Sequence, residues 1–446
     1  MKRVLVANRG EIAVRIIQAC RACDVESVAV YSQADQASSH TWEADHAVRI
    51  GHAAAGDSYL RADRLLHVAL ATGCDGLHPG YGFLSERADF IEQCSAEGIV
   101  FIGPAAEHIR LMGDKAEARR TVSGLGVPVV PGSAGSFADP DRAYAEAAAI
   151  GYPMLLKARS GGGGRGMRVV EEAGRFQAQF TQARVEAEAA FGDGEIYLER
   201  YFQRIRHIEV QVFGDRHGQV RHLGERDCTL QRRHQKLLEE SPSPALDQAT
   251  RERICQAAVT IAKGIDYEGA GTVEFIYDAD SGEFFFIEMN TRIQVEHPVT
   301  EVVTGCDLVA EQIRVAAGQP LSFADRQPPS AGHAIEFRIN AEDPARGFMP
   351  SPGVLRRWQP PQGEGIRCDS HVYQGYAVPP YYDSLLGKLI VHGRDRAAAL
   401  ARARDALRAF VVEGVATTIP FHLRVLEHPD FIANRVHTRW VETELN

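Results

Sequence analysis

The chain has 446 residues and a formal net charge of −10 at pH 7, and 24% of its residues are charged. This length exceeds what one hydrophobic core usually organises, so we expect about three domains. The acidic balance argues against a nucleic-acid-binding surface, which would need a basic patch. No run approaches the ~18 apolar residues of a membrane span, and the amino terminus has no apolar signal segment. We therefore expect a cytoplasmic protein with no membrane or nucleic-acid partner.

The amino-terminal part of the chain alternates predicted strands and helices. A strand over Lys2–Ala7, a helix from Glu11 to about Cys23 and a strand over Ser27–Tyr31 form a β–α–β unit, which is typical of a parallel sheet covered by helices. The same unit suggests a dehydrogenase as an alternative class. No G-x-G-x-x-G follows the first strand, and the absence of this dinucleotide fingerprint weighs against that alternative.

A run of glycines interrupts the middle of the chain. A predicted strand, Pro153–Lys157, leads into Ser160–Gly166, which contains four consecutive glycines, and the strand Met167–Val170 follows. Bare backbone can approach an anion closely, so the tip of this hairpin is suited to close over phosphates. A flexible surface turn is the alternative interpretation.

Two further segments concentrate polar side chains. Arg226–Lys236 packs four Arg or Lys residues and one His into eleven positions, which indicates either an anion site or a solvated basic loop. Gly271–Tyr277 and Glu283–Asn290 are predicted to form a hairpin in which Glu274 faces Glu288. Two facing carboxylates are suited to a divalent metal ion.

The hairpin's second strand leads into the most informative segment of the sequence. If residues 284–296 are extended, one face of the strand carries five polar side chains. These are Glu288, Asn290, Arg292, Gln294 and Glu296. Carboxylate and amide oxygens suit Mg²⁺, and a guanidinium suits a planar oxyanion, so the face predicts a combined cation and oxyanion site; a polar edge strand is the alternative.

The carboxyl-terminal region repeats this kind of pattern more briefly. A predicted strand over His333–Ile339 carries Glu336 and Arg338 on one face, and a helix is predicted at about Asp395–Phe410. The chain as a whole is expected to combine α/β and α+β domains.

Long sequence motifs then identify a resemblance. They are ANRGEIAVRI, HPGYGFLSE, FIGP, RLMGDK, GGGGRGMRVV, ERDCTLQRRHQK, FIEMNTRIQVEHPVTE, FRINAEDP and VPPYYDS. With these motifs the chain resembles biotin carboxylase, the ATP-grasp subunit of biotin-dependent carboxylases, and most of all the bacterial acetyl-CoA carboxylase subunit. The resemblance runs from Val4 to about Glu442.

The resemblance implies a fold and a reaction. Residues 1–113 would form a Rossmann-like parallel sheet, residues 114–330 an ATP-grasp region with a mobile glycine-rich lid at about 130–203, and residues 331–446 a mixed carboxyl-terminal domain. ATP would phosphorylate bicarbonate to carboxyphosphate, and the carboxyl group would pass to a ureido nitrogen of biotin. The metal would be Mg²⁺ or Mn²⁺, with two ions bound between the ATP phosphates.

Site residues follow from the resemblance, position by position. The catalytic residues would be Glu296 as the base, with Arg292, Lys236 and Arg338. The bicarbonate site would be Lys236, Arg292, Gln294 and Val295. The biotin site would be Tyr81, Glu86 and Arg338. The metal ligands would be Glu274, Glu288 and Asn290. The ATP site would be Lys115, Lys157, Gly162, Gly163, Gly164, Met167, Glu199, Arg200, Phe202, His207, Gln231, His234, Glu274, Ile276 and Glu288.

Partners are implied in the same way. The family attaches biotin to a Met-Lys-Met triplet, and no such triplet occurs in this sequence. The resemblance therefore implies a separate biotin carboxyl carrier protein, separate carboxyltransferase subunits and a homodimer, whose strength Gln18 and Ala22 leave open. Arg159 stands where the family usually has a small residue, with an effect on the lid that the sequence leaves open. Alternatives within this interpretation are a subunit of a pyruvate, propionyl-CoA or other acyl-CoA carboxylase, and a non-catalytic regulatory paralogue.

Overall fold

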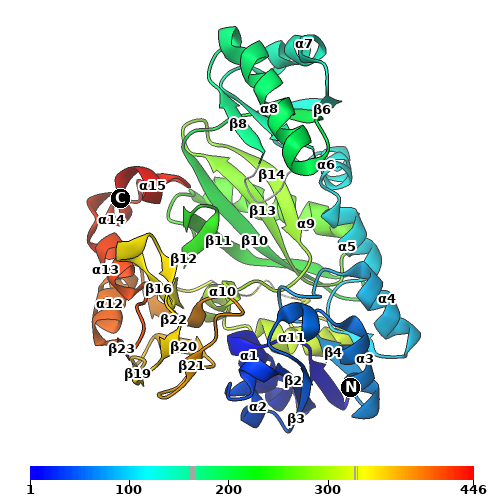
Figure 1. The fold of residues 1–446 in the computed structure, drawn as a ribbon, viewed down its shortest axis with the longest axis vertical. Helices are drawn as coiled ribbons and strands as arrows, with labels where there is room; N and C mark the ends of the chain where they lie inside the picture. Colours follow the sequence, from blue (N-terminus) through cyan, green and yellow to red (C-terminus); the bar gives the residue numbers. More distant parts are fainter. Residues whose placement is uncertain (160–165, 326–327, 329, 446) are drawn as a thin grey trace.

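The computed structural model describes residues 1–159, 166–325, 328 and 330–445 of the chain. Figure 1 shows an amino-terminal sheet with its helices at lower right, a small lid at the top, and a large sheet that runs from the centre towards the carboxyl-terminal helices at left. The glycines Gly162, Gly163 and Gly164, which are expected to contact ATP, lie outside the described residues. Among the helices of the described residues, none combines the length and apolar character needed to cross a membrane.

The amino-terminal sheet has five strands, and all its neighbouring strands run parallel. In spatial order they are β3 (His46–Gly51), β2 (Glu26–Ser32), β1 (Arg3–Val6), β4 (Gly76–His78) and β5 (Val100–Phe101). Its helices are α1 (Gly10–Ala22), α2 (His40–Glu43), α3 (Ala62–Ala71), α4 (Ala88–Ala96) and α5 (Ala106–Gly113). The predicted β–α–β unit is confirmed as β1, α1 and β2, whereas β3 and β4 were not predicted from the sequence.

Both faces of this sheet are buried, as a parallel sheet requires. Val4 and Val6 on β1 pack into the core that contains α1, whereas Leu5 packs into the opposite core, which contains α3 and α4. The alternation of side chains along one short strand therefore joins two separate hydrophobic cores.

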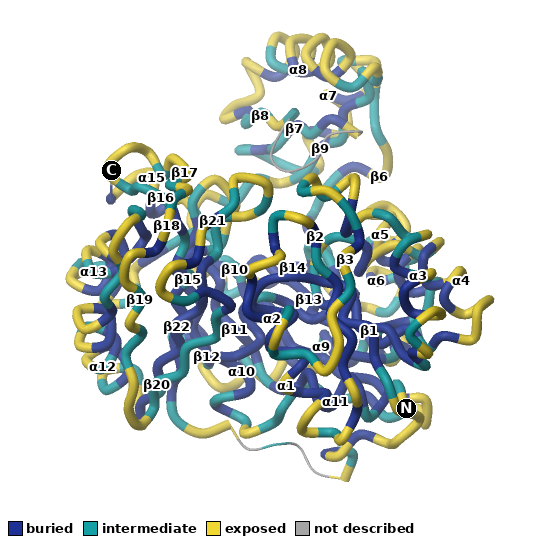
Figure 2. The backbone as a smooth tube through the Cα atoms, turned by 60° about the horizontal axis from the view of Figure 1, so that its bottom comes forward, coloured by how far each residue is buried: buried dark blue, intermediate teal, exposed yellow. Residues whose placement is uncertain are grey.

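The lid is a four-stranded antiparallel sheet with two helices. In spatial order its strands are β6 (Gly132–Phe137), β9 (Ile196–Arg200), β7 (Met154–Ala158) and β8 (Met167–Val170). The helices α7 (Pro140–Ile150) and α8 (Phe176–Phe191) share one apolar core with these strands. The pairing of β7 with β8 confirms the hairpin predicted on either side of the glycine run. Figure 2 shows that the lid helices keep long exposed faces.

The large sheet has eight strands and continues across residue 330. Its antiparallel order is β14 (Glu283–Asn290), β13 (Gly269–Asp278), β10 (Ile205–Gly214), β11 (Val220–Arg232), β12 (Gln235–Ser241), β15 (His333–Asn340), β22 (Leu385–Gly393) and β20 (Ile366–Ser370). The junction is the pair β12–β15, in which Leu238 lies opposite Phe337. Residues from the predicted ATP-grasp and carboxyl-terminal regions therefore share one hydrogen-bonded surface.

Helices and short strands complete the chain around this sheet. The helices are α6 (Lys115–Gly124), α9 (Gln248–Gly264), α10 (His297–Thr304), α11 (Leu308–Ala316), α12 (Arg396–Ala409), α13 (Ile419–Glu427), α14 (Pro429–Ile432) and α15 (Trp440–Glu444), with single 3₁₀ turns at Gln33–Asp35, Ala55–Asp57, Ala173–Arg175 and Pro344–Arg346. The short strands are β16 (Glu342–Asp343), β17 (Met349–Pro350), β18 (Gly353–Val354), β19 (Arg357–Gln359), β21 (Ala377–Val378) and β23 (Val411–Glu413). Helix α10 packs across β11, β12, β15 and β22, so the residue just before it reaches the middle of the sheet.

Two expectations about local structure were wrong. The segment expected to be extended through residue 296 is a strand only as far as Asn290, and Glu296 is instead the N-cap position of α10. Pro298 in the first turn favours a helix start there, because its fixed φ and missing N–H suit that position. The alternative of a solvated loop for Arg226–Lys236 is also wrong: the segment forms the end of β11, a tight turn and the start of β12.

Candidate active site

The site is built around Lys236 near the start of β12. Its Nζ lies 2.6 Å from Glu209 Oε2, 3.0 Å from Glu274 Oε1 and 2.7 Å from Glu296 Oε1. Burial alone would lower the pKa of this ammonium, but the three carboxylates raise that pKa well above its usual value. Lys236 is therefore a fixed positive charge at the point where three segments of the chain meet.

The carboxylates are aligned by sheet register. Glu209 on β10 lies opposite Arg226 on β11 and opposite Glu274 on β13. Arg226 is fully buried, and its guanidinium donates to Glu209 and to Gln294 Oε1 at 3.2 Å. Replacing either partner would leave a charge buried without compensation, so Arg226 and Glu209 depend on each other for stability.

Glu209 was not predicted from the sequence, although a signal was available. His207, Glu209 and Gln211 alternate along β10 with the fully buried Ile208 and Val210. Period-two alternation of charged and apolar residues in a buried strand is the pattern that marks such a face.

Glu296 is a buried carboxylate surrounded by three cations. Only 2% of the residue is exposed, and its second oxygen, Oε2, accepts from Arg338 at 3.0 Å. Burial would raise its pKa, but Lys236, Arg338 and Arg226 together hold the pKa of Glu296 below its usual range. The carboxylate is therefore ionised at any pH near neutrality, so both of its oxygens can accept hydrogen bonds.

Arg338 on β15 has a second carboxylate partner behind it. Its Nε donates to Glu239 Oε1 at 2.7 Å, so the guanidinium lies between Glu239 and Glu296. Burial would lower the pKa of Arg338, but Glu239 and Glu296 raise it. This clamp orients a cation towards the same space that Glu296 faces.

Arg292, Gln294 and Val295 lie in the turn between β14 and α10. Arg292 donates to Glu86 Oε2 at 2.9 Å and to Asn290 Oδ1 at 3.1 Å, while Gln294 Nε2 donates to Glu274 at 2.9 Å. The carbonyl of Val295 accepts from Lys388 at 2.8 Å. The structure thus brings the expected bicarbonate residues to one cluster, although by a turn rather than along one strand face.

The residues expected to bind metal lie close together on the paired strands β13 and β14. Glu274 and Glu288 are direct cross-strand partners, and Asn290 Nδ2 donates to Glu274 at 2.8 Å. Burial would raise the pKa of Glu274, but Lys236 and His207 hold the pKa well below its usual value, so an ionised oxygen is available. The Glu288 side chain is 39% exposed and faces the Lys115 ammonium at 3.6 Å. An ionised buried carboxylate beside a half-exposed one and an amide oxygen is a donor set that suits Mg²⁺.

A different set of groups also lies at ligand spacing. Within the described residues, His207, Glu209 and Glu274 place their ligand atoms within 4.8 Å of one another, as do Glu209, Cys228 and Glu296. His207 Nε2 is 2.9 Å from Glu274 Oε2. Burial lowers the pKa of His207 and Glu274 raises it, and the net direction is upwards. Both sets share the Glu209 carboxylate, which already pairs with Arg226 and Lys236, so we assign no metal to either set as a whole.

Several of the polar residues expected at ATP lie on the lid strands β7 and β9. Lys157 on β7 forms a short ion pair with Glu199 on β9, and Arg119 approaches the same carboxylate at 3.4 Å. Arg200 lies over the Phe202 ring, with 5.2 Å between the guanidinium carbon and the ring centroid. The Lys115 side chain is 77% exposed.

An apolar surface adjoins these groups. Phe202 stacks on Phe285 with ring centroids 5.2 Å apart, and Ile276 belongs to the same cluster. Met167 on β8 is 38% exposed. Flat apolar walls beside lysines are suited to a purine ring with attached phosphates.

Gln231 and His234 are separated by the β11–β12 turn. Gln231 is buried directly opposite Lys236, whereas His234 is exposed with a φ of 65°. The structure therefore brings Gln231, but not the ring of His234, into the buried cluster.

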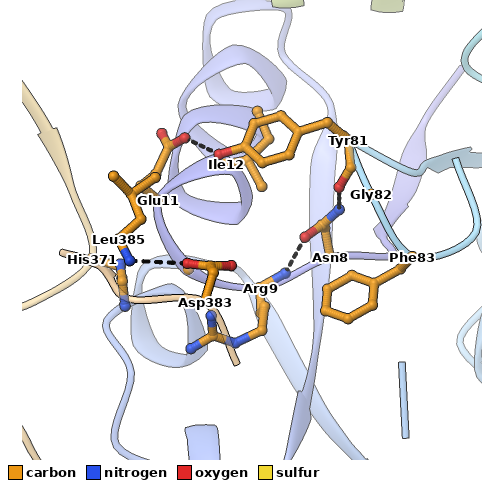
Figure 3. Close-up of a pocket in the computed structure, with 11 residues that line it drawn as sticks. Asn8, Arg9, Glu11, Ile12, Tyr81, Gly82, Phe83, His371, Asp383 and Leu385 are labelled. Carbon is orange, nitrogen blue, oxygen red and sulfur yellow. Dashed lines mark hydrogen bonds between the residues drawn. The ribbon is translucent and has the colours of Figure 1, made fainter. Parts of the chain in front are cut away.

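Tyr81, one of the three residues expected at biotin, borders a cavity of about 210 Å³ between the amino-terminal and carboxyl-terminal parts (Figure 3). Its lining includes Arg9, Glu11, Tyr81, His371 and Asp383. In Figure 3 the Tyr81 hydroxyl points to Glu11. Glu11 also pairs with Lys388 at 3.0 Å, and Lys388 donates to the Val295 carbonyl. A series of polar contacts therefore links the cavity wall to Val295. Neither Glu86 nor Arg338 is among the lining residues, so the structure does not bring the three expected biotin residues to this one cavity.

Comparison with known proteins identifies the family. The model described as the biotin carboxylase amino-terminal domain matches residues 1–109, and the carbamoyl-phosphate synthase L chain ATP-binding domain matches residues 114–324. The biotin carboxylase carboxyl-terminal domain matches residues 336–443. The chain belongs to the biotin carboxylase family.

Individual relatives agree over the whole length. The chain is 52% identical to "Biotin carboxylase 1" of Bacillus subtilis over 443 residues, which is 99% of this chain and 98% of that one. It is 50% identical to a pyruvate carboxylase subunit of Methanothermobacter thermautotrophicus, covering 99% of this chain and 89% of the relative. The biotin carboxylase domain dimer of the Hydrogenobacter thermophilus 2-oxoglutarate carboxylase, solved with MgADP, ADP and bicarbonate, superposes with a TM-score of 0.90 at 47% identity, covering 99% and 97% of the two chains.

These matches confirm the resemblance found in the sequence. The fold class, with an amino-terminal parallel sheet and an ATP-grasp region, is confirmed, and so is the expectation of an ATP-dependent ligase. The family comprises subunits of biotin-dependent carboxylases, and dimers are known among its structures.

Proposed function

We propose that this chain is the biotin carboxylase subunit of a multi-subunit carboxylase. It uses ATP to transfer the carboxyl group of bicarbonate, through carboxyphosphate, to biotin held on a separate carrier protein. The observation that carries this proposal is the cluster in which Glu296 contacts both Lys236 and Arg338, in a chain of this family. A base, an anion-binding ammonium and a guanidinium in contact are what carboxyl transfer from bicarbonate to a weakly acidic nitrogen needs.

Glu296 accepts the proton of bicarbonate in this proposal. Its low pKa makes it a weak base, so the neighbouring cations must also make bicarbonate more acidic. Lys236 and Arg292 supply that positive charge, and Gln294 and the Val295 backbone complete the anion site. The oxygen freed of its proton then attacks the γ-phosphorus of ATP, and ADP leaves.

Glu274, Glu288 and Asn290 hold Mg²⁺ or Mn²⁺ in this scheme, and the metal neutralises charge on the phosphates when it is bound. Lys115, Lys157 and His207 contact the nucleotide's phosphates or ribose, with Gln231 and His234 nearby. Phe202, Met167 and Ile276 enclose the base beside the backbone of Glu199 and Arg200. Gly162, Gly163 and Gly164, which lie outside the described residues, are proposed to contact the ATP phosphates.

Arg338 stabilises the negative charge that develops on the ureido oxygen of biotin, and Tyr81 and Glu86 border the same substrate. A fixed guanidinium aimed at a developing oxyanion contributes most when water is excluded. The clamp between Glu239 and Glu296 supports this role because it leaves Arg338 little freedom to reorient.

The remaining parts of the proposal concern organisation and partners. The chain divides at residues 113 and 330, is cytoplasmic, forms a homodimer and works with a biotin carboxyl carrier protein and carboxyltransferase subunits. Acetyl-CoA is the proposed final acceptor. A pyruvate carboxylase is the second candidate setting, because a relative that carries this name is 50% identical.

The function is tested with purified protein, free biotin and labelled bicarbonate. Phosphate release should require bicarbonate and Mg²⁺ and should rise on addition of biotin, with label appearing in biotin. Equal rates with and without biotin at saturating ATP and bicarbonate would contradict the proposal. Reconstitution with carrier and transferase, supplied with acetyl-CoA or pyruvate, then distinguishes the two settings, and sedimentation measures the dimer.

A further inference from the structure

Glu239 is a buried carboxylate with one occupied and one unoccupied oxygen. It lies on β12 with no exposed surface, and its Oε1 accepts from Arg338 Nε at 2.7 Å. Its Oε2 has no hydrogen-bond partner among the described residues. A buried acceptor left unpaired is costly, so this oxygen calls for a donor.

Glu336 lies directly across from it. In the β12–β15 ladder Glu239 is opposite Glu336, and opposite residues of an antiparallel pair project from the same face about 5 Å apart at Cβ. Arg338 is two residues further along β15 and so shares that face. Glu336 is fully buried, and within the described part of the chain neither of its oxygens has a hydrogen-bond partner.

The nearby cations are already engaged. Lys388 bonds to Glu11 and to the Val295 carbonyl, and Arg338 bonds to Glu239 and Glu296. An ionised Glu336 would thus be a buried charge without a hydrogen bond, beside another carboxylate, and the neutral acid avoids that cost. In agreement, burial together with Glu239 raises the pKa of Glu336 well above its usual value, and burial raises the pKa of Glu239 to about 7.

We propose that Glu239 is a positioning residue for Arg338, and that Glu336 is a neutral acid whose O–H donates to the free oxygen of Glu239. The hydrogen-bonded series from Glu336 through Glu239 to Arg338 then ends at the guanidinium proposed to contact biotin. One shared proton satisfies the unpaired oxygen of Glu239 and gives Glu336 its partner.

This inference rests on the proposed role of Arg338 in carboxylating biotin. If Glu239 lost the donor from Glu336, its carboxylate could rotate and Arg338 would turn towards Glu296 alone. The guanidinium would then be less well directed at the ureido oxygen, and the base would be more strongly paired. The expected loss therefore appears in the steps that use biotin.

The kinetic test compares two substitutions of Glu336 with a matched control. Glu336→Gln keeps an N–H donor for Glu239, whereas Glu336→Leu keeps the approximate volume without a donor. Glu240→Gln is the control, because the neighbouring Glu240 pairs with Arg396 and His333 rather than with Arg338. For Glu336→Leu we expect kcat/KM for biotin to fall by roughly tenfold or more, since a hydrogen bond to a charged group is lost. Glu336→Gln should restore most of that loss, and the control should keep the wild-type KM for biotin.

An infrared titration tests the protonation directly and does not depend on turnover. The wild type should show the C=O stretch of a buried protonated carboxyl group near neutral pH, and Glu336→Gln should remove it. Several charged or titratable groups surround Glu239 and Glu336, and they are the same in the wild type and in Glu336→Gln. They are Arg338 on β15, Lys388 on β22, Lys236 on β12, Cys228 on β11 and Glu296 before α10.

The outcomes separate this inference from the proposed function. A wild type without biotin-stimulated turnover would overturn the function, while the infrared band would still decide the state of Glu336. An unchanged band in Glu336→Gln, or equal kcat/KM for biotin in the wild type and Glu336→Leu, would overturn the inference. If Glu336→Leu does not fold, the infrared band, which Glu336→Gln should lose, decides it.

Discussion

Arg338 Nη2 lies 3.0 Å from Glu296 Oε2, so the proposed biotin-binding cation and the proposed base neutralise each other before any substrate is bound. Lys236 holds the other oxygen of the same carboxylate. In the proposed mechanism the Glu296 carboxylate therefore links the two half-reactions, and substitutions of Glu296 or Arg338 should separate them.

Replacing Glu296 should stop the first half-reaction. Glu296→Ala removes the proton acceptor, and we expect bicarbonate-dependent ATP cleavage to fall by at least about a hundredfold, the usual contribution of a positioned base. Phosphate release with and without bicarbonate measures this. Glu296→Gln, which keeps the shape but not the charge, should be as inactive; an active Gln variant would exclude the role as base.

Replacing Arg338 should uncouple the two half-reactions. Arg338→Ala should retain part of the bicarbonate-dependent ATP cleavage but lose carboxybiotin formation, because the oxyanion partner of biotin is gone. Removing this cation should also raise the pKa of Glu296, which Lys236 and Arg338 now hold low. Since Glu296 must be ionised to act, the acid limb of the ATP cleavage profile should move to higher pH. Full coupling in this variant would refute the assignment.

The metal site can be tested at Glu288. Glu288→Gln removes one anionic ligand from a half-exposed position, so we expect the Mg²⁺ concentration for half-maximal rate to rise and kcat to fall by roughly tenfold or more while folding is preserved. Glu283→Gln on the same strand is the control, because that residue is exposed at the far end of β14. Wild-type turnover of Glu288→Gln at limiting Mg²⁺ would contradict the assignment.

Stability should depend on Glu240, away from the proposed chemistry. Its pKa is lowered to about 2: burial would raise it, but His333 and Arg396 outweigh that effect. A folded-state pKa below the unfolded value stabilises the fold above pH ~4.5, and this contribution is lost as pH falls through about 2. Glu240→Gln should therefore cost about 3 kcal/mol of unfolding free energy at pH 7. Denaturant unfolding at pH 7 and pH 3 measures this, and the deficit should shrink at the lower pH; an equal deficit at both would count against the ion pair.

Much of the fold could be predicted where local pattern and tertiary packing agree. Strand β1, helix α1 and the hairpin of β13 with β14 follow from apolar periodicity, and the pairing of Glu274 with Glu288 follows from hairpin register. The short strand β4, with three residues, was missed because its pattern is too brief to separate from a loop.

Other features depend on contacts distant in sequence. The segment Arg226–Lys236 has a basic, solvated composition, yet Arg226 is fully buried because Glu209, from another strand, compensates its charge. The turn before α10 was not predicted because alternation continues past Asn290 although the strand does not. Glu239 gave no local signal, and Glu336 was recognised only as sharing a strand face with Arg338; the pairing of Glu239 with Glu336 comes from their facing each other across two strands.

The ion pairs around Lys236 also bear on which anions the site can accept. Each cation proposed to meet bicarbonate already has a carboxylate from the same chain: Lys236 has Glu296, and Arg292 has Glu86. These tethered carboxylates are competitors at high effective concentration, so a plain anion such as nitrate gains little by displacing them. Bicarbonate differs because it carries an O–H that can donate to the displaced carboxylate. The cluster should therefore select for protonated oxyanions, with modest affinity, rather than for negative charge alone.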